Sequence, residues 1–246
     1  MLVLATLLCL AIGLSLGMLG GGGAALALPV FVYVAGLPAA DAVTVSLIVV
    51  GATSLVATMG HLRHGQVDAR AVALVAGAGI PGTLLGAAFT SLVPPSVLLG
   101  AFAVLLLGAA AWMGFGKIPA PRPARRWPVI AVTGAGVGIL TGFLGVGGGF
   151  LLVPVLTRLV GLETRRAIGT SLAVITINCV AGVLGHLGHA SPPLAPTVSF
   201  TLAAGLGAVA GQLAGQRLRI SHLHRGFAIL LGSVGAAVAW RVVVAS

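Results

Sequence analysis

The sequence predicts an all-α integral membrane protein made of two inverted repeats, each a glycine-broken, re-entrant helical hairpin followed by three transmembrane helices. Three observations predict this class: the composition, a repeat of 125 residues, and a reversal of loop charge between the two copies. The chain of 246 residues is 59% hydrophobic and only 7% charged, with a mean hydropathy of +1.18. Soluble domains carry roughly 25% charged residues, so the composition indicates a protein that lies almost wholly within the lipid bilayer.

A shift of 125 residues aligns the two halves of the chain without a gap. The aligned pairs include Gly17 with Gly142, Pro29 with Pro154, Ser46 with Ser171, His61 with His186, Gly82 with Gly207, and Phe102 with Phe227. Self-similarity at a fixed period indicates duplication of one structural unit. We expect a first repeat over residues 1–115, a linker over 116–127 and a second repeat over 128–246, together forming one membrane domain.

Each repeat contains four apolar segments. In the first repeat these segments cover residues 1–35, 42–60, 70–91 and 96–115. In the second repeat they cover residues 128–160, 167–186, 195–216 and 223–244. The connector KIPAPRPARR, over residues 117–126, is basic and rich in proline, so we expect a cytoplasmic linker.

Equivalent loops of the two repeats differ in charge. The loop at 61–70 is basic, whereas its counterpart at 187–195 has no Lys or Arg. The reverse holds for the uncharged or acidic loops at 35–41 and 91–95, whose counterparts at 158–166 and 217–225 are basic. Because cytoplasmic loops are enriched in Lys and Arg, the second repeat is predicted to lie upside down relative to the first, with both termini outside. The alternative, eight plain spans in two parallel copies, contradicts this charge pattern.

Inversion requires an odd number of crossings in each repeat, although each repeat has four apolar segments. One segment must therefore enter and leave the membrane on the same side. The first segment is the candidate, because glycines interrupt it. In the second repeat its two arms, about 16 and about 11 residues, span roughly 24 and 16 Å against a hydrocarbon core of about 30 Å. We expect six full spans and two re-entrant hairpins.

Two glycine runs mark the breaks: GMLGGGGAALALP over residues 17–29 and GFLGVGGGFLLVP over residues 142–154. Irregular backbone at membrane depth is tolerated only where it is buried in protein or lines a cavity. The helix that follows each break would point free N–H groups and a positive dipole end at a small oxyanion. The predicted anion-binding residues of the tips are Gly20, Gly22, Gly23, Gly145, Gly147, Gly148 and Gly149. Close helix packing is the alternative role for glycine, and it accounts for the ladder Gly134, Gly138 and Gly142.

The second apolar segment of each repeat supplies small polar side chains. Ser171 and Asn178 are seven residues apart, two helical turns, so they share one helix face. Hydroxyl and amide groups donate hydrogen bonds to an anion without holding it by a full charge. The predicted substrate-binding residues of this kind are Ser46, Thr53, Thr170, Ser171 and Asn178. Hydrogen bonding between helices is the alternative role for these side chains.

No catalytic residue, metal site or cofactor is predicted, and we expect the protein not to be an enzyme. No Lys, Arg, Asp or Glu falls in the middle of an apolar segment, so a carboxylate proton relay has no support. Three histidine pairs have the spacing of metal ligands: His61 and His64, His186 and His189, His222 and His224. Inversion would put the first two pairs on opposite sides of the membrane, so we expect histidines at helix ends. The basic residues lie between apolar segments rather than in one patch, so no nucleic-acid partner is expected.

The glycine runs with their prolines, the block Gly169-Thr170-Ser171-Leu172, the repeat and the basic linker resemble the sulfite exporter TauE/SafE family of membrane transporters. The resemblance covers essentially the whole chain, although Thr44-Val45-Ser46-Leu47 replaces the block in the first copy. It implies a multi-pass protein of the plasma membrane that moves sulfur oxyanions or organosulfonates, such as sulfite or sulfoacetate. We expect alternating access, with the lipid bilayer and a small anion as partners. A passive anion channel and a histidine–metal membrane enzyme are the alternatives.

Overall fold

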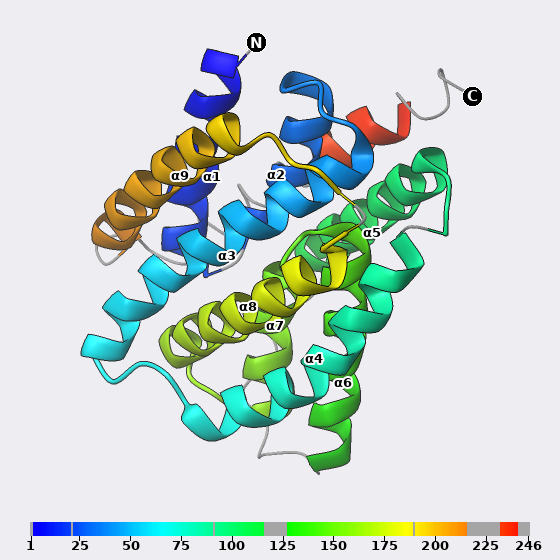
Figure 1. Cartoon of the computed structure of the whole chain (residues 1–246). Coiled ribbons are helices and arrows are strands. Elements are labelled where there is room, and N and C mark those ends of the chain that lie inside the picture. The colour runs from blue at the N-terminus through cyan, green and yellow to red at the C-terminus, as the bar shows by residue number, and fades with distance from the viewer. Residues whose placement is uncertain are drawn as a thin grey trace.

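The structure is a computed structural model that describes residues 2–20, 22–90, 92–115, 127–188, 190–215 and 232–240. Every regular element in these residues is a helix, which confirms the all-α class (Figure 1). Residues 116–126 of the predicted linker and the predicted basic loop at 217–225 lie outside the described residues, as does His189.

The helices follow the 125-residue repeat. The first half contains α1 (Leu2–Leu19), α2 (Ala24–Pro29), the π-helix η1 (Val30–Val34), α3 (Ala39–Arg63), α4 (Ala69–Thr90) and α5 (Pro95–Phe115). The second half contains α6 (Trp127–Leu144), α7 (Gly149–Val155), the π-helix η2 (Leu156–Val160), α8 (Thr164–His186) and α9 (Leu194–Gly215), and residues 232–240 are also helical. Adding 125 to the bounds of α1 and of α4 gives the bounds of α6 and of α9.

Four of the described helices are long and apolar enough to cross a membrane: α3, α4, α8 and α9. Shorter apolar helices cover Leu2–Met18, Ala24–Val34, Pro95–Ala111 and Pro128–Leu144. The long helices begin and end within three residues of the apolar segments that predicted them. The last predicted span, 223–244, lies largely outside the described residues.

Helices α3 and α8 pack against each other at the centre and run antiparallel (Figure 1). The glycine contacts give their direction. Gly51 of α3 faces Cys179, and a Cβ at Gly51 would lie 2.9 Å from the Cys179 Cβ. Ten residues further along α3, His61 packs against Gly169, ten residues earlier in α8. Residue numbers therefore rise along one helix as they fall along the other.

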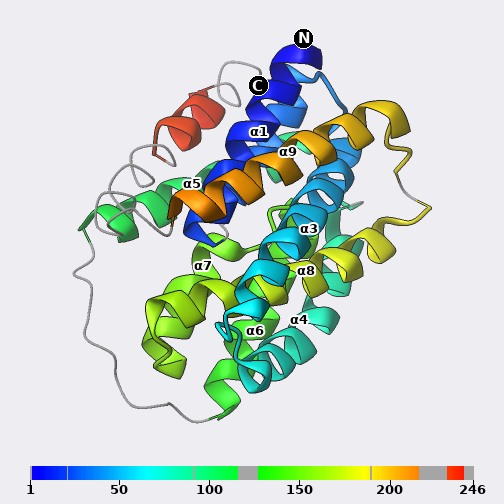
Figure 2. The ribbon, with the colours of Figure 1, turned by 90° about the vertical axis from the view of Figure 1, so that its left-hand side faces the viewer.

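The flanking helices pack in two parallel pairs, α1 with α9 and α4 with α6 (Figure 2). Each pair joins the first α-helix of one half to the fourth α-helix of the other half. Glycine permits the close approach: a Cβ at Gly138 would collide with the carbonyl oxygen of Gly79 on α4. Gly134 and Gly142 meet α4 carbonyl oxygens in the same way, so the predicted packing role of this glycine ladder is confirmed.

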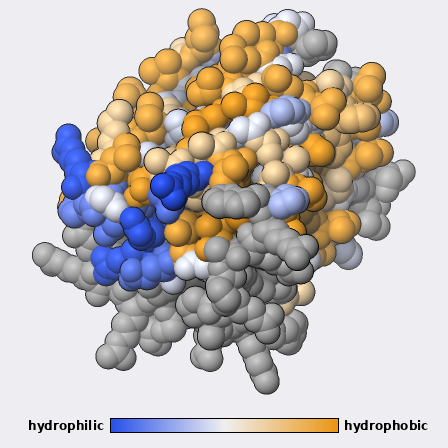
Figure 3. Space-filling view, turned by 90° about the horizontal axis from the view of Figure 1, so that it is seen from below, coloured by the Kyte–Doolittle hydropathy of each residue, from blue (hydrophilic) through white to orange (hydrophobic). Residues whose placement is uncertain are grey.

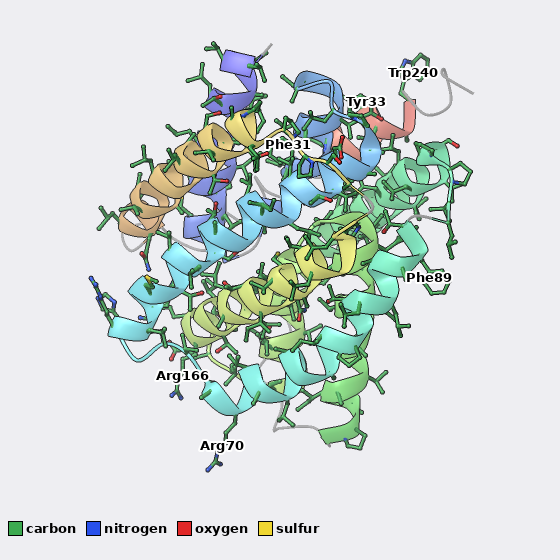
Figure 4. The ribbon with its side chains drawn as sticks, viewed as in Figure 1. Phe31, Tyr33, Arg70, Phe89, Arg166 and Trp240 are labelled. Carbon is green, nitrogen blue, oxygen red and sulfur yellow. The ribbon has the colours of Figure 1, made fainter. Side chains whose placement is uncertain are left out.

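The arginines whose side chains are described gather at one end of the helix bundle. Arg63 ends α3, Arg70 lies in the first turn of α4, and Arg165 and Arg166 lie in the first turn of α8; all four are exposed. Figure 4 shows Arg70 and Arg166 together at this end, with Trp240 far from them. Figure 3 views the molecule from below and shows hydrophilic side chains gathered beside a largely hydrophobic surface.

Candidate anion site

The helices break at the two predicted glycine runs. α1 ends at Leu19 and α2 begins at Ala24, whereas α6 ends at Leu144 and α7 begins at Gly149. Gly20 and Gly145, which are equivalent in the repeat, both have a φ of +68°. Residues that carry a side chain rarely adopt this left-handed backbone conformation, so glycine is required where each helix turns.

Beyond each break the chain folds back against the helix it has just left. Gly23 packs against Ile12 and Leu16 of α1, and Gly148 packs against Val137 and Thr141 of α6. We call these two folded-back segments the first tip, with the described residues 20, 22 and 23, and the second tip, residues 145–149. All seven glycines predicted to bind the anion are buried: Gly20, Gly22, Gly23, Gly145, Gly147, Gly148 and Gly149. The tips are therefore part of the protein core, as irregular backbone at membrane depth requires.

Each tip is held by the central helix of the other half. The Ser46 hydroxyl of α3 donates a hydrogen bond to the Gly145 carbonyl oxygen at 2.5 Å. The Ser171 hydroxyl of α8 lies 2.7 Å from the Gly20 carbonyl oxygen and 2.8 Å from the Ile168 carbonyl oxygen. Its single proton can be donated to either of these two oxygens. The structure thus brings two predicted serines to two predicted tip glycines, where each hydroxyl positions the tip backbone.

The second tip lies against the crossing of the two central helices. A Cβ at Gly147 would lie 2.9 Å from Val50 of α3 and 3.0 Å from Ile175 of α8. In this tip Gly145 donates its amide proton to Thr141, and Leu151 and Leu152 donate to the Gly148 carbonyl oxygen. Within the described residues, the amides of Gly147 and Gly148 have no protein acceptor. Helices α2 and α7, which follow the two tips, contact each other, so the two tips lie near one another.

A return arm leads from each tip back to the surface. Pro29 ends α2 and the chain continues as η1, whereas Pro154 lies inside α7 before η2. On the first return arm, Phe31 stacks on Phe200 of α9, with ring centroids 5.3 Å apart; Figure 4 labels Phe31 beside α9. The arm of one half is thereby packed on a long helix of the other half.

Thr170 and Thr53 are buried but do not contact a tip through their hydroxyls. Thr170 Oγ1 accepts a hydrogen bond from the Asp68 backbone amide at 2.9 Å, and the Asp68 carboxylate in turn caps the start of α4 at Ala71. Thr53 Oγ1 donates to the Val49 carbonyl oxygen of its own helix. The first hydroxyl therefore fastens the loop between α3 and α4, and the second satisfies its own helix.

Two buried polar side chains of the central helices have no hydrogen-bond partner. Both amide atoms of Asn178 and the Ser54 hydroxyl are unpaired, and each residue has 0% exposure. Asn178 faces α4, where a Cβ at Gly79 would lie 2.7 Å from Asn178 Oδ1. Ser54 was not among the predicted residues. Its counterpart in the repeat is Cys179, which lies beside Gly147 in the structure, a contact that the sequence does not reveal.

Charged groups are absent from the described core. No Lys, Arg, Asp or Glu whose side chain is described is buried. His61 and His186 lie at opposite ends of the antiparallel pair, where His61 Nδ1 is 2.7 Å from Gln66 Oε1 and His186 Nδ1 donates to Gly182 O at 2.8 Å. The described part of the chain holds no group of three or more His, Cys, Asp or Glu side chains that would bind a metal ion.

A cavity of about 270 Å³ lies at the end of the central pair away from the arginines. Residues from α3, α4, α5 and α8 line it, including Ala39, Ala87, Thr90, Leu98 and His186. The neighbouring loops are those without Lys or Arg, at 35–41, 91–95 and 187–195. The cavity thus lies mainly among helices of the first half, with His186 of α8 at its wall, on the side that the charge pattern predicts to be external.

Comparison with known proteins identifies the family of the chain. A family model described as sulfite exporter TauE/SafE matches residues 5–238. A probable membrane transporter protein of Xylella fastidiosa strain Temecula1 is 31% identical over 239 residues, which cover 94% of this chain and 92% of that protein. The probable membrane transporter protein YdhB of Bacillus subtilis is 25% identical over 183 residues, covering 72% and 75%. No solved structure gives a significant match. The chain therefore belongs to the sulfite exporter TauE/SafE family of membrane transporters.

Proposed function

We propose that the protein carries small anions of the sulfur oxyanion or organosulfonate class, such as sulfite or sulfoacetate, across the plasma membrane by alternating access. The anion is held at the two glycine tips. Family membership supports the substrate class, because the matching family is described as a sulfite exporter. The observation that carries the site is the pair of crossed hydrogen bonds, Ser46 to Gly145 and Ser171 to Gly20, which fixes both tips inside the core.

The two halves are inverted repeats in this proposal. In two parallel copies the equivalent helices α3 and α8 would point the same way, whereas they run antiparallel. Inversion also makes α1 parallel to α9 and α4 parallel to α6, as observed. The arginines of the α3–α4 loop and of the α8 start share one end, which fits a cytoplasmic face. The tips then enter as re-entrant hairpins from opposite sides.

The anion is bound by backbone amides and neutral side chains. The free amides of Gly147 and Gly148 precede α7, which continues through η2 to Val160, so a positive helix end faces the crossing. The unpaired Asn178 amide and Ser54 hydroxyl are on the same pair of central helices. With no buried charge among the side chains that are described, the anion is held by dipoles and hydrogen bonds, which permits release on either side.

The crossed connections between the halves support alternating access. Each tip is tied to the central helix of the other half, so a rocking of one half against the other moves both tips together. The cavity beside His186 and Thr90 is the external approach to this crossing. Asp41 of α3 accepts a hydrogen bond from Ser191 at the same end, a contact between the halves that such a motion would break.

Uptake of labelled sulfite or a labelled sulfonate into proteoliposomes tests the proposal. We expect saturable uptake by the wild type, and its loss in Gly148→Leu, because a side chain there would press on Val137 and Thr141 at a φ of +61°. Gly136→Leu is the matched control, since Gly136 is exposed on the same helix hairpin with nothing within 4 Å of a Cβ. Size-exclusion chromatography establishes that each variant is folded.

Ser171→Ala is the second test variant if Gly148→Leu does not fold. It removes the tie to Gly20 while it keeps the backbone conformation of the tip. Intact uptake in a folded Gly148→Leu or Ser171→Ala protein would contradict the tip site. Uptake that never saturates and shows no counter-exchange would instead favour a passive anion channel.

A further inference from the structure

Asn178 presents both a donor and an acceptor without partners in the middle of α8. Its Nδ2 and Oδ1 atoms are both buried and both unpaired, so the observation does not depend on which atom is nitrogen. Burying an unpaired amide costs free energy. A ligand that offers one acceptor and one donor would remove that cost.

We infer, on the basis of the proposed function, that within this class of anions the site at Asn178 prefers monoanions that also carry a hydrogen-bond donor, such as hydrogensulfite or a hydroxylated alkanesulfonate, over dianions such as sulfoacetate. An anionic oxygen of such a ligand accepts from Asn178 Nδ2, and its hydroxyl group donates to Asn178 Oδ1. A sulfate or sulfite dianion has acceptors only. Either dianion would leave Asn178 Oδ1 without a donor and next to negative charge. A buried acceptor without a donor raises the free energy of the complex.

The electrostatics of the core favour the same class of ligand. The Lys and Arg residues whose side chains are described include no buried one that would offset a second negative charge. Transfer of an ion into a medium of low dielectric constant is expensive, and the cost rises with the square of the charge. Backbone amides and an uncharged carboxamide are therefore suited to one negative charge rather than two.

Access to Asn178 passes along α4. The amide packs against Gly79, where no side chain intervenes, and Pro81 lies two residues further along the same helix. Proline lacks the amide that would bond to the carbonyl oxygen of Gly77, so the helix is weakened there. Separation of α4 from α8 at this weak point would uncover the amide for a ligand.

The experiment measures anion binding to the purified full chain in lipid nanodiscs by isothermal titration calorimetry. The probes are 2-hydroxyethanesulfonate, the similarly sized 1-propanesulfonate, which lacks the donor, and sulfate as a dianion. We expect 2-hydroxyethanesulfonate to bind about tenfold more tightly than 1-propanesulfonate, the scale of one unsatisfied buried acceptor, and sulfate to bind most weakly. Asn178→Leu should abolish the preference for the hydroxylated probe.

Thr201→Val is the control, because the Thr201 hydroxyl donates within α9 to Thr197 and the preference should persist. Asn178→Leu should also keep or raise the thermal stability, since it removes an unpaired buried amide. Equal affinity for all three probes, or a preference that survives Asn178→Leu, would overturn the inference and leave the proposed function standing. Absence of both binding and uptake of every anion would overturn the proposed function itself.

Discussion

Ser46 donates a hydrogen bond to the carbonyl oxygen of Gly145, 2.5 Å away, although 99 residues separate them in the chain. The repeat generates the same contact a second time, between Ser171 and Gly20, across 151 residues. In both cases the serine belongs to a central helix and the glycine to the tip of the other half. Two buried hydroxyls therefore join the halves at the points where the backbone leaves helical geometry.

Ser46→Ala should destabilise the protein, whereas Ser54→Ala should not. Loss of the Ser46 hydroxyl leaves the buried Gly145 carbonyl oxygen without its partner, a cost of about 1–3 kcal/mol. The Ser54 hydroxyl has no partner to lose, so its removal is neutral or stabilising. The two serines lie on one helix and undergo the same substitution. Thermal unfolding in detergent measures the difference, and equal shifts for both variants would contradict the assigned hydrogen bond.

Two glycines of α6 should respond in opposite directions to alanine. Gly138→Ala places a methyl group on the Gly79 carbonyl oxygen, so α4 and α6 must separate and the protein loses stability. Gly136→Ala meets nothing within 4 Å at an exposed position, and the gain in helix propensity is worth up to about 1 kcal/mol. Thermal unfolding in detergent distinguishes the two variants. A tolerated Gly138→Ala would show that α4 and α6 do not approach this closely.

Single cysteines at Leu162 and Ala190 should be labelled from opposite sides of the membrane. Leu162 precedes α8 and Ala190 follows it, and the inverted arrangement puts the first position inside and the second outside. The background replaces Cys9 and Cys179, both of which are buried, with alanine. The measurement is labelling by a membrane-impermeant maleimide, which reaches external cysteines on intact cells and cytoplasmic cysteines on inverted vesicles. Labelling of both positions from one face would exclude the proposed orientation.

The sequence predicted the helices well because its strongest signals are local or periodic. The glycine runs fall on the breaks after Leu19 and Leu144, since glycine is required at a φ of +68° in Gly20 and Gly145. The long helices coincide with the apolar segments, since each must remain apolar across the bilayer. The ladder at Gly134, Gly138 and Gly142 also pointed correctly to close packing.

The partners of individual polar groups were not predictable in the same way. Whether a buried hydroxyl binds a ligand, its own helix or another helix depends on the neighbouring elements. Thr170 thus fastens the Asp68 loop and Thr53 bonds to Val49, whereas Ser46 reaches the opposite tip. Ser54 carries no motif, and its lack of a partner is visible only once the helices are packed.

The most direct measurement is counterflow of labelled 2-hydroxyethanesulfonate or sulfite into proteoliposomes preloaded with the unlabelled anion, for the wild type, Gly136→Ala and Ser171→Ala. We predict saturable exchange by the wild type and by Gly136→Ala. Exchange by Ser171→Ala should be strongly reduced, because the first tip loses its tie to α8. Anion flux that does not saturate, or that is unchanged in folded Ser171→Ala protein, would contradict an alternating-access transporter built around the two glycine tips.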